Sequence, residues 1–301
     1  MANPANKSKQ VETTGHVWDG DLREYNNPLP NWWLWSFYAT IIFAVVYWII
    51  YPAWPVGKSF TRGIATVTVE ENGQTKEMPW NSRSQLIAEM QSSPAAVKQR
   101  EYIEKVGAAS YEEILANPDM MAFARSMAKG YFGDYCAACH GQGGQGNLPF
   151  FPNLADDDWL WGGKVEHIQA SISSGRKGNM PAFANVQGQA LDDLASYVLS
   201  LSGEAVDAAA AERGKQGYAM CMGCHGAEGK GNPMLGAANL TDKAWSVINI
   251  PAAGSIEEKK KLVAGVINKG IAREMPAFGS RLKPEEIKML TVYVHELGGG
   301  K

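Results

Sequence analysis

A five-residue pattern, Cys-x-x-Cys-His, occurs twice in this chain of 301 residues and uses all four of its cysteines. The copies lie in "YCAACHG" at 135–141 and in "MCMGCHG" at 220–226. The pattern restricts the fold more than any other feature, because each copy holds two thiols and an imidazole together in one short turn. Any fold of this chain must leave space at two such turns for whatever the thiols and the imidazole bind or react with.

The two pentads belong to a longer internal repeat. Glycines follow each histidine at +1, +4 and +6, and an asparagine precedes a tryptophan by six residues in both copies. Each copy then continues with a Met-Pro-Ala-Phe segment and an apolar helical stretch, "LASYVLSL" in the first and "LTVYVHEL" in the second. We therefore predict two copies of one small domain, over residues 122–203 and 204–301.

Three kinds of site can use a Cys-x-x-Cys pair: half of a zinc site, a redox dithiol, and a covalent haem attachment site. A histidine directly after the second cysteine is typical of c-type haem, in which the thiols form thioethers and the imidazole binds the iron. A four-thiolate zinc site would need no histidine at the same place in each pair. We therefore predict two covalently bound haem c groups. The residues predicted to attach them are Cys136 and Cys139, and Cys221 and Cys224, with His140 and His225 as axial ligands.

The second axial ligand of each iron is predicted to be the methionine of the Met-Pro segment. Met180 and Met275 lie 40 and 50 residues after the histidine of their own repeat, with which we pair them. With histidine and methionine in both axial positions the iron has no open site, so we expect electron transfer and no catalytic residue. Candidates for the haem edges and propionates are Trp159, Trp245, Arg176 and Arg273, while His16, His167 and His295 are expected at the surface.

A long apolar segment precedes the repeat. The stretch from Trp32 to Tyr51 carries no charge, and as a helix it would cover about 30 Å, the thickness of a bilayer core. Aromatic residues crowd both ends, as in interfacial belts. A buried helix of a soluble domain would not normally run this far without charge. A cleaved signal peptide would not follow some 30 polar residues. We predict an uncleaved transmembrane helix over residues 31–52.

The remaining segments are predicted from composition. Residues 1–30 form a polar, irregular cytoplasmic arm. Residues 53–121 form a periplasmic spacer or docking segment, with a small hairpin around the Glu-Asn-Gly turn near residue 72 and a helical stretch over 82–115. Because haem c is attached on the outer side of the bacterial inner membrane, residues 52–301 are expected to be periplasmic. The net charge of −3 gives no reason to expect nucleic acid as a partner.

The N-terminal segment carries a specific resemblance. "WDGDLREYNNPLPNWW" at 18–33, together with the apolar stretch after it, is similar to the start of the membrane-anchored dihaem subunit of cbb3-type cytochrome c oxidases, known as subunit III or the P subunit. The order of anchor, spacer and two haem domains matches that family over nearly the whole chain. The fold class implied is mainly α, with one N-terminal transmembrane helix followed by two tandem class I cytochrome c domains.

The resemblance implies a non-catalytic electron-entry subunit in a proton-translocating oxidase. Its partners would be a catalytic haem–copper subunit, a monohaem cytochrome c subunit, a small helical subunit, membrane lipid, and a soluble cytochrome c donor. Two alternatives remain open. One is a free membrane-tethered dihaem carrier serving other periplasmic reductases. The other is a dihaem enzyme such as a peroxidase, which needs an open haem and is disfavoured by the two Met-Pro segments.

Overall fold

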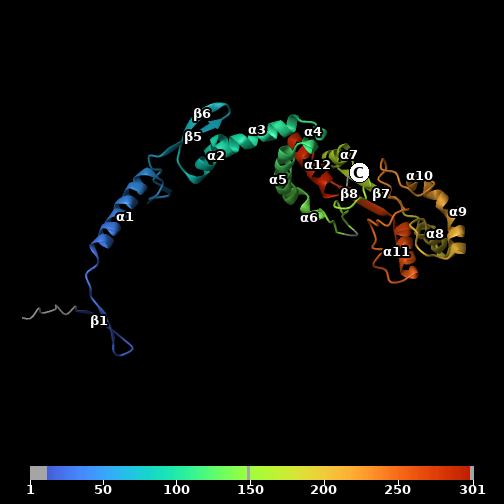
Figure 1. Ribbon diagram of the computed structural model, residues 1–301, viewed down its shortest axis with the longest axis horizontal. Helices are drawn as coiled ribbons and strands as arrows, with labels where there is room; N and C mark the ends of the chain where they lie inside the picture. The colour runs from blue at the N-terminus through green and yellow to red at the C-terminus, as the bar shows by residue number, and fades with distance from the viewer. Residues whose placement is uncertain (1–11, 148–149, 299–301) are drawn as a thin grey trace, which may run out of the picture. The chain divides into compact units, whose positions relative to one another are not determined.

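The computed structural model describes residues 12–147 and 150–298 (Figure 1). The chain divides into two compact units, Met1–Lys98 and Gln99–Lys301, which are described separately.

The first unit contains the predicted membrane helix, α1 (Asn31–Ile50). None of its residues is buried, its mean hydropathy is 1.8, and it is long and apolar enough to cross a membrane. Pro52 and Pro55 follow its end, where proline cannot continue a helix. The helix confirms the expectation from the uncharged stretch.

Hairpins flank α1 on both sides. The predicted hairpin forms from β5 (Thr66–Glu71) and β6 (Gln74–Pro79), with Asn72 and Gly73 both at positive φ in a two-residue turn. The prediction of an irregular arm before α1 was wrong, because β1 (Thr13–Trp18) and β2 (Leu22–Tyr25) pair there. Their turn passes through Asp19 and Gly20, a local signal that the sequence interpretation overlooked. A short ribbon of β3 (Pro55–Val56) and β4 (Ser59–Phe60) completes the unit's strands.

Helices fill the predicted helical stretch over 82–115. They are α2 (Ser82–Ser92), α3 (Pro94–Ala108) and α4 (Tyr111–Ala116). Capping boxes built on Asn81 and Ser110 start α2 and α4, which satisfies backbone N–H groups at each helix start. The boundary between the two units falls within α3.

The second unit contains the repeat, and its elements follow in the same order twice. The first set is α5 (Pro118–Tyr135), α6 (Ala137–His140), α7 (Val165–Ser174), β7 (Arg176–Met180) and α8 (Gly188–Leu201). The second set is α9 (Ala208–Gly217), η1 (Tyr218–Met220), α10 (Met222–His225), α11 (Ile256–Lys269), β8 (Ile271–Met275) and α12 (Pro284–Leu297).

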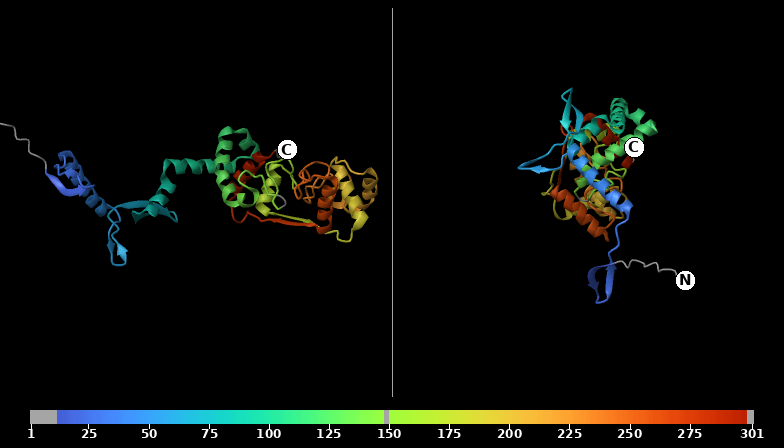
Figure 2. Two further views of the ribbon diagram at one scale, coloured as in Figure 1. Left: turned by 90° about the horizontal axis from the view of Figure 1, so that it is seen from below. Right: turned by 90° about the vertical axis from the view of Figure 1, so that its left-hand side faces the viewer.

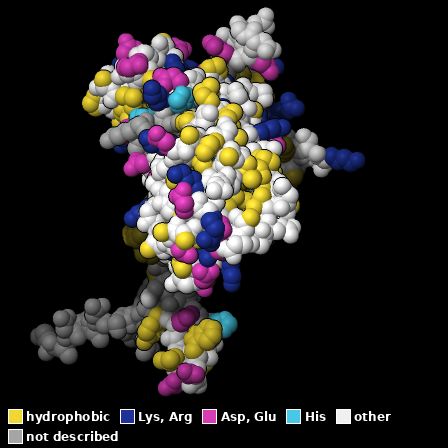
Figure 3. Space-filling view, turned by 90° about the vertical axis from the view of Figure 1, so that its right-hand side faces the viewer, with side chains coloured by type: hydrophobic (Ala, Val, Ile, Leu, Met, Phe, Trp, Pro, Cys, Tyr) yellow, Lys and Arg dark blue, Asp and Glu magenta, His cyan; other side chains and the backbone are white. Residues whose placement is uncertain are grey.

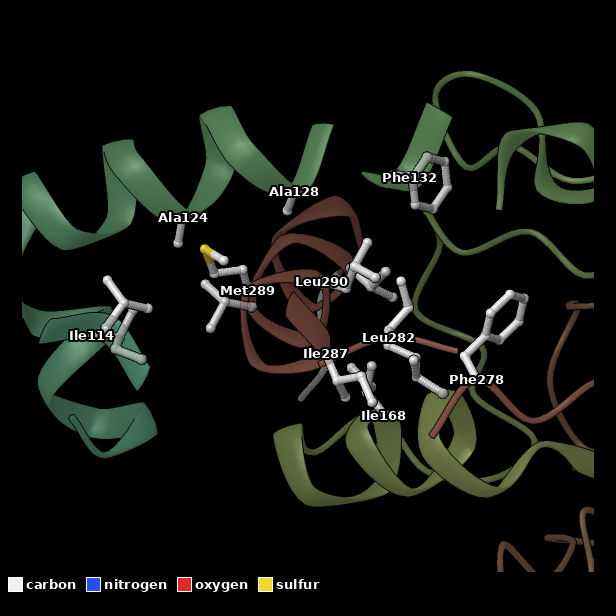
Figure 4. Close-up of a cluster of buried hydrophobic side chains, with 14 of the residues drawn as sticks. Ile114, Ala124, Ala128, Phe132, Ile168, Phe278, Leu282, Ile287, Met289 and Leu290 are labelled. Carbon is white, nitrogen blue, oxygen red and sulfur yellow. The ribbon is translucent and has the colours of Figure 1, made fainter. Parts of the chain in front are cut away.

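The first core combines the early part of the first repeat with the end of the second. Helix α12 packs on α5 and α7, and Figure 4 shows its side chains between those helices. Arg125 of α5 and Glu296 of α12 form an ion pair of 3.0 Å at the edge of this contact. The buried residues drawn there are Ile114, Ala124, Ala128, Phe132 and Ile168, followed by Phe278, Leu282, Ile287, Met289 and Leu290.

The second core is built in the same way, with the roles of the two repeats exchanged. Helix α8, the last element of the first repeat, packs on α9 and α11 of the second. Asp193 of α8 accepts two hydrogen bonds of 2.8 Å from Arg213 of α9, and Lys260 of α11 lies 2.9 Å from the carboxylate of Asp192. Its buried members are Leu194, Ala195, Val198 and Leu199 from the first repeat, with Tyr218, Ile250, Val263 and Ile267 from the second.

Strands β7 and β8 connect the two cores as an antiparallel ribbon (Figure 2). Arg176 pairs with Met275 and Met180 pairs with Ile271, so the pairing relates the two repeats symmetrically. Each strand follows a glycine, Gly175 or Gly270, whose backbone (φ about 70°, ψ near 180°) only glycine adopts readily.

The two packed cores therefore do not coincide with the two sequence repeats. Residues 122–203 and 204–301 repeat in sequence, but each core takes its last helix from the other repeat. The connection from α8 to α9 spans only residues 202–207, and a short connection favours antiparallel packing of the helices it joins. Since α8 lies against α9, the place beside α5 is taken by α12.

Candidate haem-binding sites

Each pentad forms one helical turn at the end of a helix. In the first, the amide of His140 donates to the carbonyl of Cys136 at 2.9 Å, so both lie on one short turn that follows α5. The second is built in the same way, with His225 donating to the carbonyl of Cys221 at 2.9 Å. The turns bring the predicted Cys, Cys and His of each pentad together, because residues three and four apart share a helix face.

The histidines are oriented by the loops that follow them. Nδ1 of His140 lies 3.1 Å from the carbonyl oxygen of Pro152, and Nδ1 of His225 lies 2.8 Å from that of Ala238. Because a carbonyl can only accept, each Nδ1 carries the proton, and Nε2 keeps its lone pair for a metal. Burial lowers the pKa of His140, although its bond to Pro152 opposes the shift. A neutral imidazole with a free Nε2 is the form that binds iron.

As a free thiol, the first cysteine of each pentad has a raised pKa, which does not suit a redox-active dithiol. Burial, with a smaller effect of Cys139, raises the pKa of Cys136 to about 11. Burial also raises the pKa of Cys221. Reactive dithiols depend on a lowered thiol pKa, so this environment disfavours the redox alternative. Among the described residues, no group of three or more His, Cys, Asp or Glu could hold a metal ion.

The two predicted methionine ligands pack against different cores, and each shares its core with the first cysteine of the other repeat's pentad. Met275 packs against the first core together with Cys136, and Met180 packs against the second core together with Cys221. The sequence interpretation pairs each methionine with the histidine of its own repeat, whereas in the packing each methionine shares a core with the first cysteine of the other repeat. The cause is the β7–β8 ribbon, which carries each Met-Pro segment across to the other core.

The surroundings of the pentads fit a haem. The indole N–H of Trp159 is buried against the first core and has no hydrogen-bond partner among the described residues. A buried N–H donor without a protein partner, packed against the same core as Cys136, is suited to a haem propionate. Cys139 and Cys224 are exposed, so one side of each turn stays open to a bound group. The glycines at +1, +4 and +6 all have positive φ in both copies, at Gly141, Gly144, Gly146, Gly226, Gly229 and Gly231.

Other residues singled out in the sequence have protein partners. Arg176 bonds Ser171 and lies 4.9 Å from the ring centre of Trp161, while Arg273 bonds the carbonyl of Ser246. His16 is exposed, as expected. His167 and His295 were expected at the surface but are half-buried, and their Nδ1 atoms are buried.

Figure 3 shows one face of the second unit, the side at the right of Figure 1. Apolar side chains gather there among basic and acidic ones. Exposed apolar residues lie within the second pentad or near it in the sequence, namely Met220, Met222, Met234 and Leu235.

Comparison with known proteins gives the family. The model for the N-terminal domain of cytochrome oxidase-cbb3, FixP, matches residues 10–58. The model for cytochrome c oxidase, cbb3-type, subunit III, matches residues 123–198 and 209–294, which together exceed half of the chain. The chain belongs to the cbb3-type cytochrome c oxidase subunit III family.

Relatives of this subunit III support the assignment over its full length. The subunit FixP of the cbb3-type cytochrome c oxidase from Azorhizobium caulinodans is 43% identical, and the alignment covers 99% of this chain and 97% of the relative. The subunit CcoP from Azospirillum brasilense is 40% identical over 97% and 96% of the two chains. FixP from Bradyrhizobium diazoefficiens is 41% identical over 96% and 95%.

Membership confirms several expectations from the sequence. The chain is mainly helical, with one candidate membrane helix and two tandem cytochrome c domains. It is an electron-transfer subunit of a cbb3-type oxidase and works together with other oxidase subunits. Cytochrome c domains imply bound haem c, and the apolar helix of such a subunit indicates a single pass through the inner membrane.

Proposed function

We propose that this is the electron-entry subunit of the oxidase. It accepts electrons from a soluble cytochrome c and relays them, through the monohaem subunit, toward the haem–copper catalytic subunit. It does no oxygen chemistry itself, and a small helical subunit belongs to the same assembly. Haem c, when bound, supplies a one-electron iron couple.

The observation that carries this function is the matched construction of the two sites. Each pentad turn offers two thiols for attachment and a histidine with a free Nε2, and each adjoining core presents a methionine. The proposed ligands are His140 and His225 with Met180 and Met275, and the proposed attachment residues are Cys136, Cys139, Cys221 and Cys224. With a histidine and a methionine both holding it, the iron would exchange electrons without binding substrate, which disfavours a peroxidase.

The topology of the chain follows from the same chemistry. Attachment of haem c requires the pentads to lie outside the bacterial inner membrane. Residues 52–301 are then periplasmic, α1 spans the bilayer and residues 1–30 face the cytoplasm. In this orientation the haem domains meet a soluble periplasmic donor.

Purification from membranes tests this function against a free tethered carrier. A tagged chain solubilised in mild detergent should bring down a haem–copper subunit and a monohaem cytochrome c, and the complex should consume oxygen with reduced soluble cytochrome c. The control is the same complex with Cys136→Ser and Cys139→Ser, matched for assembly by its co-purifying subunits. We expect that variant to lose at least tenfold in oxygen consumption. A chain that is always recovered alone would support the tethered carrier instead.

A further inference from the structure

We propose that the two haem sites exchange their methionines. Met275, from the second repeat, completes the iron held by His140, and Met180, from the first repeat, completes the iron held by His225. This crossed ligation rests on the proposed haem ligation and adds which methionine serves which iron.

The composition of the two cores is the first argument. The core beside the first pentad takes Ala128 and Phe132 from α5, but Ile287, Met289 and Leu290 from α12. All five are at most 5% exposed, so α12 is an integral part of that core and no mere surface contact (Figure 4). Met275, which precedes α12, packs against this core, while Met180, which precedes α8, packs against the other. The segment that reaches the first pentad is therefore the one that leads into α12.

The β7–β8 ribbon is the second argument. Five residues of each strand pair over their whole length, from Arg176 opposite Met275 to Met180 opposite Ile271. An extended strand of five residues covers roughly 16 Å, enough to carry a chain from one core to the next. The amide of Phe278 donates to the carbonyl of Ile172, and the amide of Phe183 donates to that of Ile267. After the ribbon, the segment that follows each strand is thus hydrogen-bonded to a helix of the other repeat, α7 or α11.

Two aromatic side-chain contacts, one in each core, join the two repeats in the same exchanged way. Tyr293 of α12 lies 5.3 Å from Phe132 of α5, measured between ring centres. Tyr197 of α8 lies 5.2 Å from Tyr218, just before the second pentad. The two tyrosines occupy matching positions in "LASYVLSL" and "LTVYVHEL". An arrangement within each repeat would instead pair Tyr197 with Phe132 and Tyr293 with Tyr218.

The exchange is a domain swap within one chain. Swapping replaces contacts inside a domain by the same contacts between domains, so it changes the connectivity and leaves each core filled. Here it makes every haem site a joint product of both repeats. Loss of the methionine in one repeat then opens the iron in the other.

Single-haem chains test the ligand exchange directly. In the full chain with Cys136→Ser and Cys139→Ser, the remaining haem sits on the second pentad. Crossed ligation predicts that Met180→Leu abolishes the methionine–iron charge-transfer absorption of that haem and makes it bind carbon monoxide. Met275→Leu, the matched control, should leave both properties unchanged. In the reciprocal background, Cys221→Ser with Cys224→Ser, the two methionines should exchange these effects.

The outcomes separate the exchange from the ligation itself. If Met275→Leu opens the second haem and Met180→Leu opens the first, the exchange is wrong and the methionine ligation stands. If neither methionine matters in either background, the proposed ligation fails as well.

Photo-crosslinking gives a readout that does not depend on either haem variant. Tyr293→p-benzoylphenylalanine in the otherwise unaltered dihaem chain should crosslink to a peptide from 118–135 after illumination, as mass spectrometry would show. The matched probe, Tyr197→p-benzoylphenylalanine, should crosslink to a peptide around Tyr218. Crosslinks from position 293 to the region 208–220 and from position 197 to the region 118–135 would overturn the exchange.

Discussion

At each pentad a single hydrogen bond determines which ring nitrogen of the histidine can bind a metal. The carbonyls of Pro152 and Ala238 each accept from a histidine Nδ1, which fixes the tautomer and leaves Nε2 free. Both carbonyls come from the loop that follows the glycines of the repeat. The glycines therefore act on the metal site indirectly, because their positive φ angles let this loop return to the histidine.

The two pentads also predict how many haems are covalently attached to each chain. Replacing Cys136 and Cys139 by serine should leave one covalent haem, because the second pentad lies in its own turn and keeps its own thiols. The pyridine haemochrome absorbance per mole of protein should fall by half. The matched control, Cys221→Ser with Cys224→Ser, should give the same halving. Two covalent haems in either variant would contradict the assignment of the pentads.

At the level of elements, the sequence predicts what local signals encode. The uncharged run at 32–51 gave helix α1, and Asn72-Gly73 gave the β5–β6 hairpin. Asp19-Gly20 carried the same kind of signal for β1–β2 and was overlooked. The exchange of α8 and α12 has no such signal. Both helices present a similar apolar face, so either could fill either core, and the choice depends on the short loop at 202–207 and on tertiary packing.

The ribbon elements depend on two glycines that the repeat places at matching positions. A Cβ on Gly175 would collide with the carbonyl oxygen of Met275, and one on Gly270 would lie 2.5 Å from that of Met180. Together with the glycine-only backbone, this predicts that Gly175→Ala or Gly270→Ala destabilises the protein by on the order of 1–3 kcal/mol. Urea unfolding of the purified chain would measure the loss.

Gly178, in the middle of the same ribbon, provides the control. Its φ is not positive and a Cβ there would meet nothing within 4 Å. Gly178→Ala should therefore unfold close to the unaltered chain. Equal stabilities for Gly175→Ala and Gly178→Ala would contradict the close approach at the start of the ribbon.

At the level of the whole molecule, the two units should separate in function. Removing residues 1–93 deletes the membrane helix and keeps α3 whole, and both cores lie beyond that point. Exported behind a cleavable signal, this fragment should be soluble and carry two haems, measured again by pyridine haemochrome. A correctly exported fragment without haem would show that the cores depend on the first unit.

A shorter fragment gives the opposite expectation. Residues 94–203 contain the first pentad but lack α12, which contributes Ile287, Met289 and Leu290 to its core. Removing so much buried apolar area from a small domain leaves too little to hold it folded. We expect this fragment to be unfolded or degraded. A stable fragment with one methionine-ligated haem would mean that the repeats close independently.

The β7–β8 ribbon also sets the order in which the protein can be completed. Pro284, where α12 begins, lies 144 positions after His140. At roughly 5–20 residues per second, the first pentad emerges some 7–30 s before the helix that closes its core. The first core therefore stays incomplete until α12 has been made and exported, and a chain cut short at any point before α12 never closes it. Under the proposed crossed ligation, full coordination of the first iron would serve as a chemical mark that the segment leading into α12 has arrived.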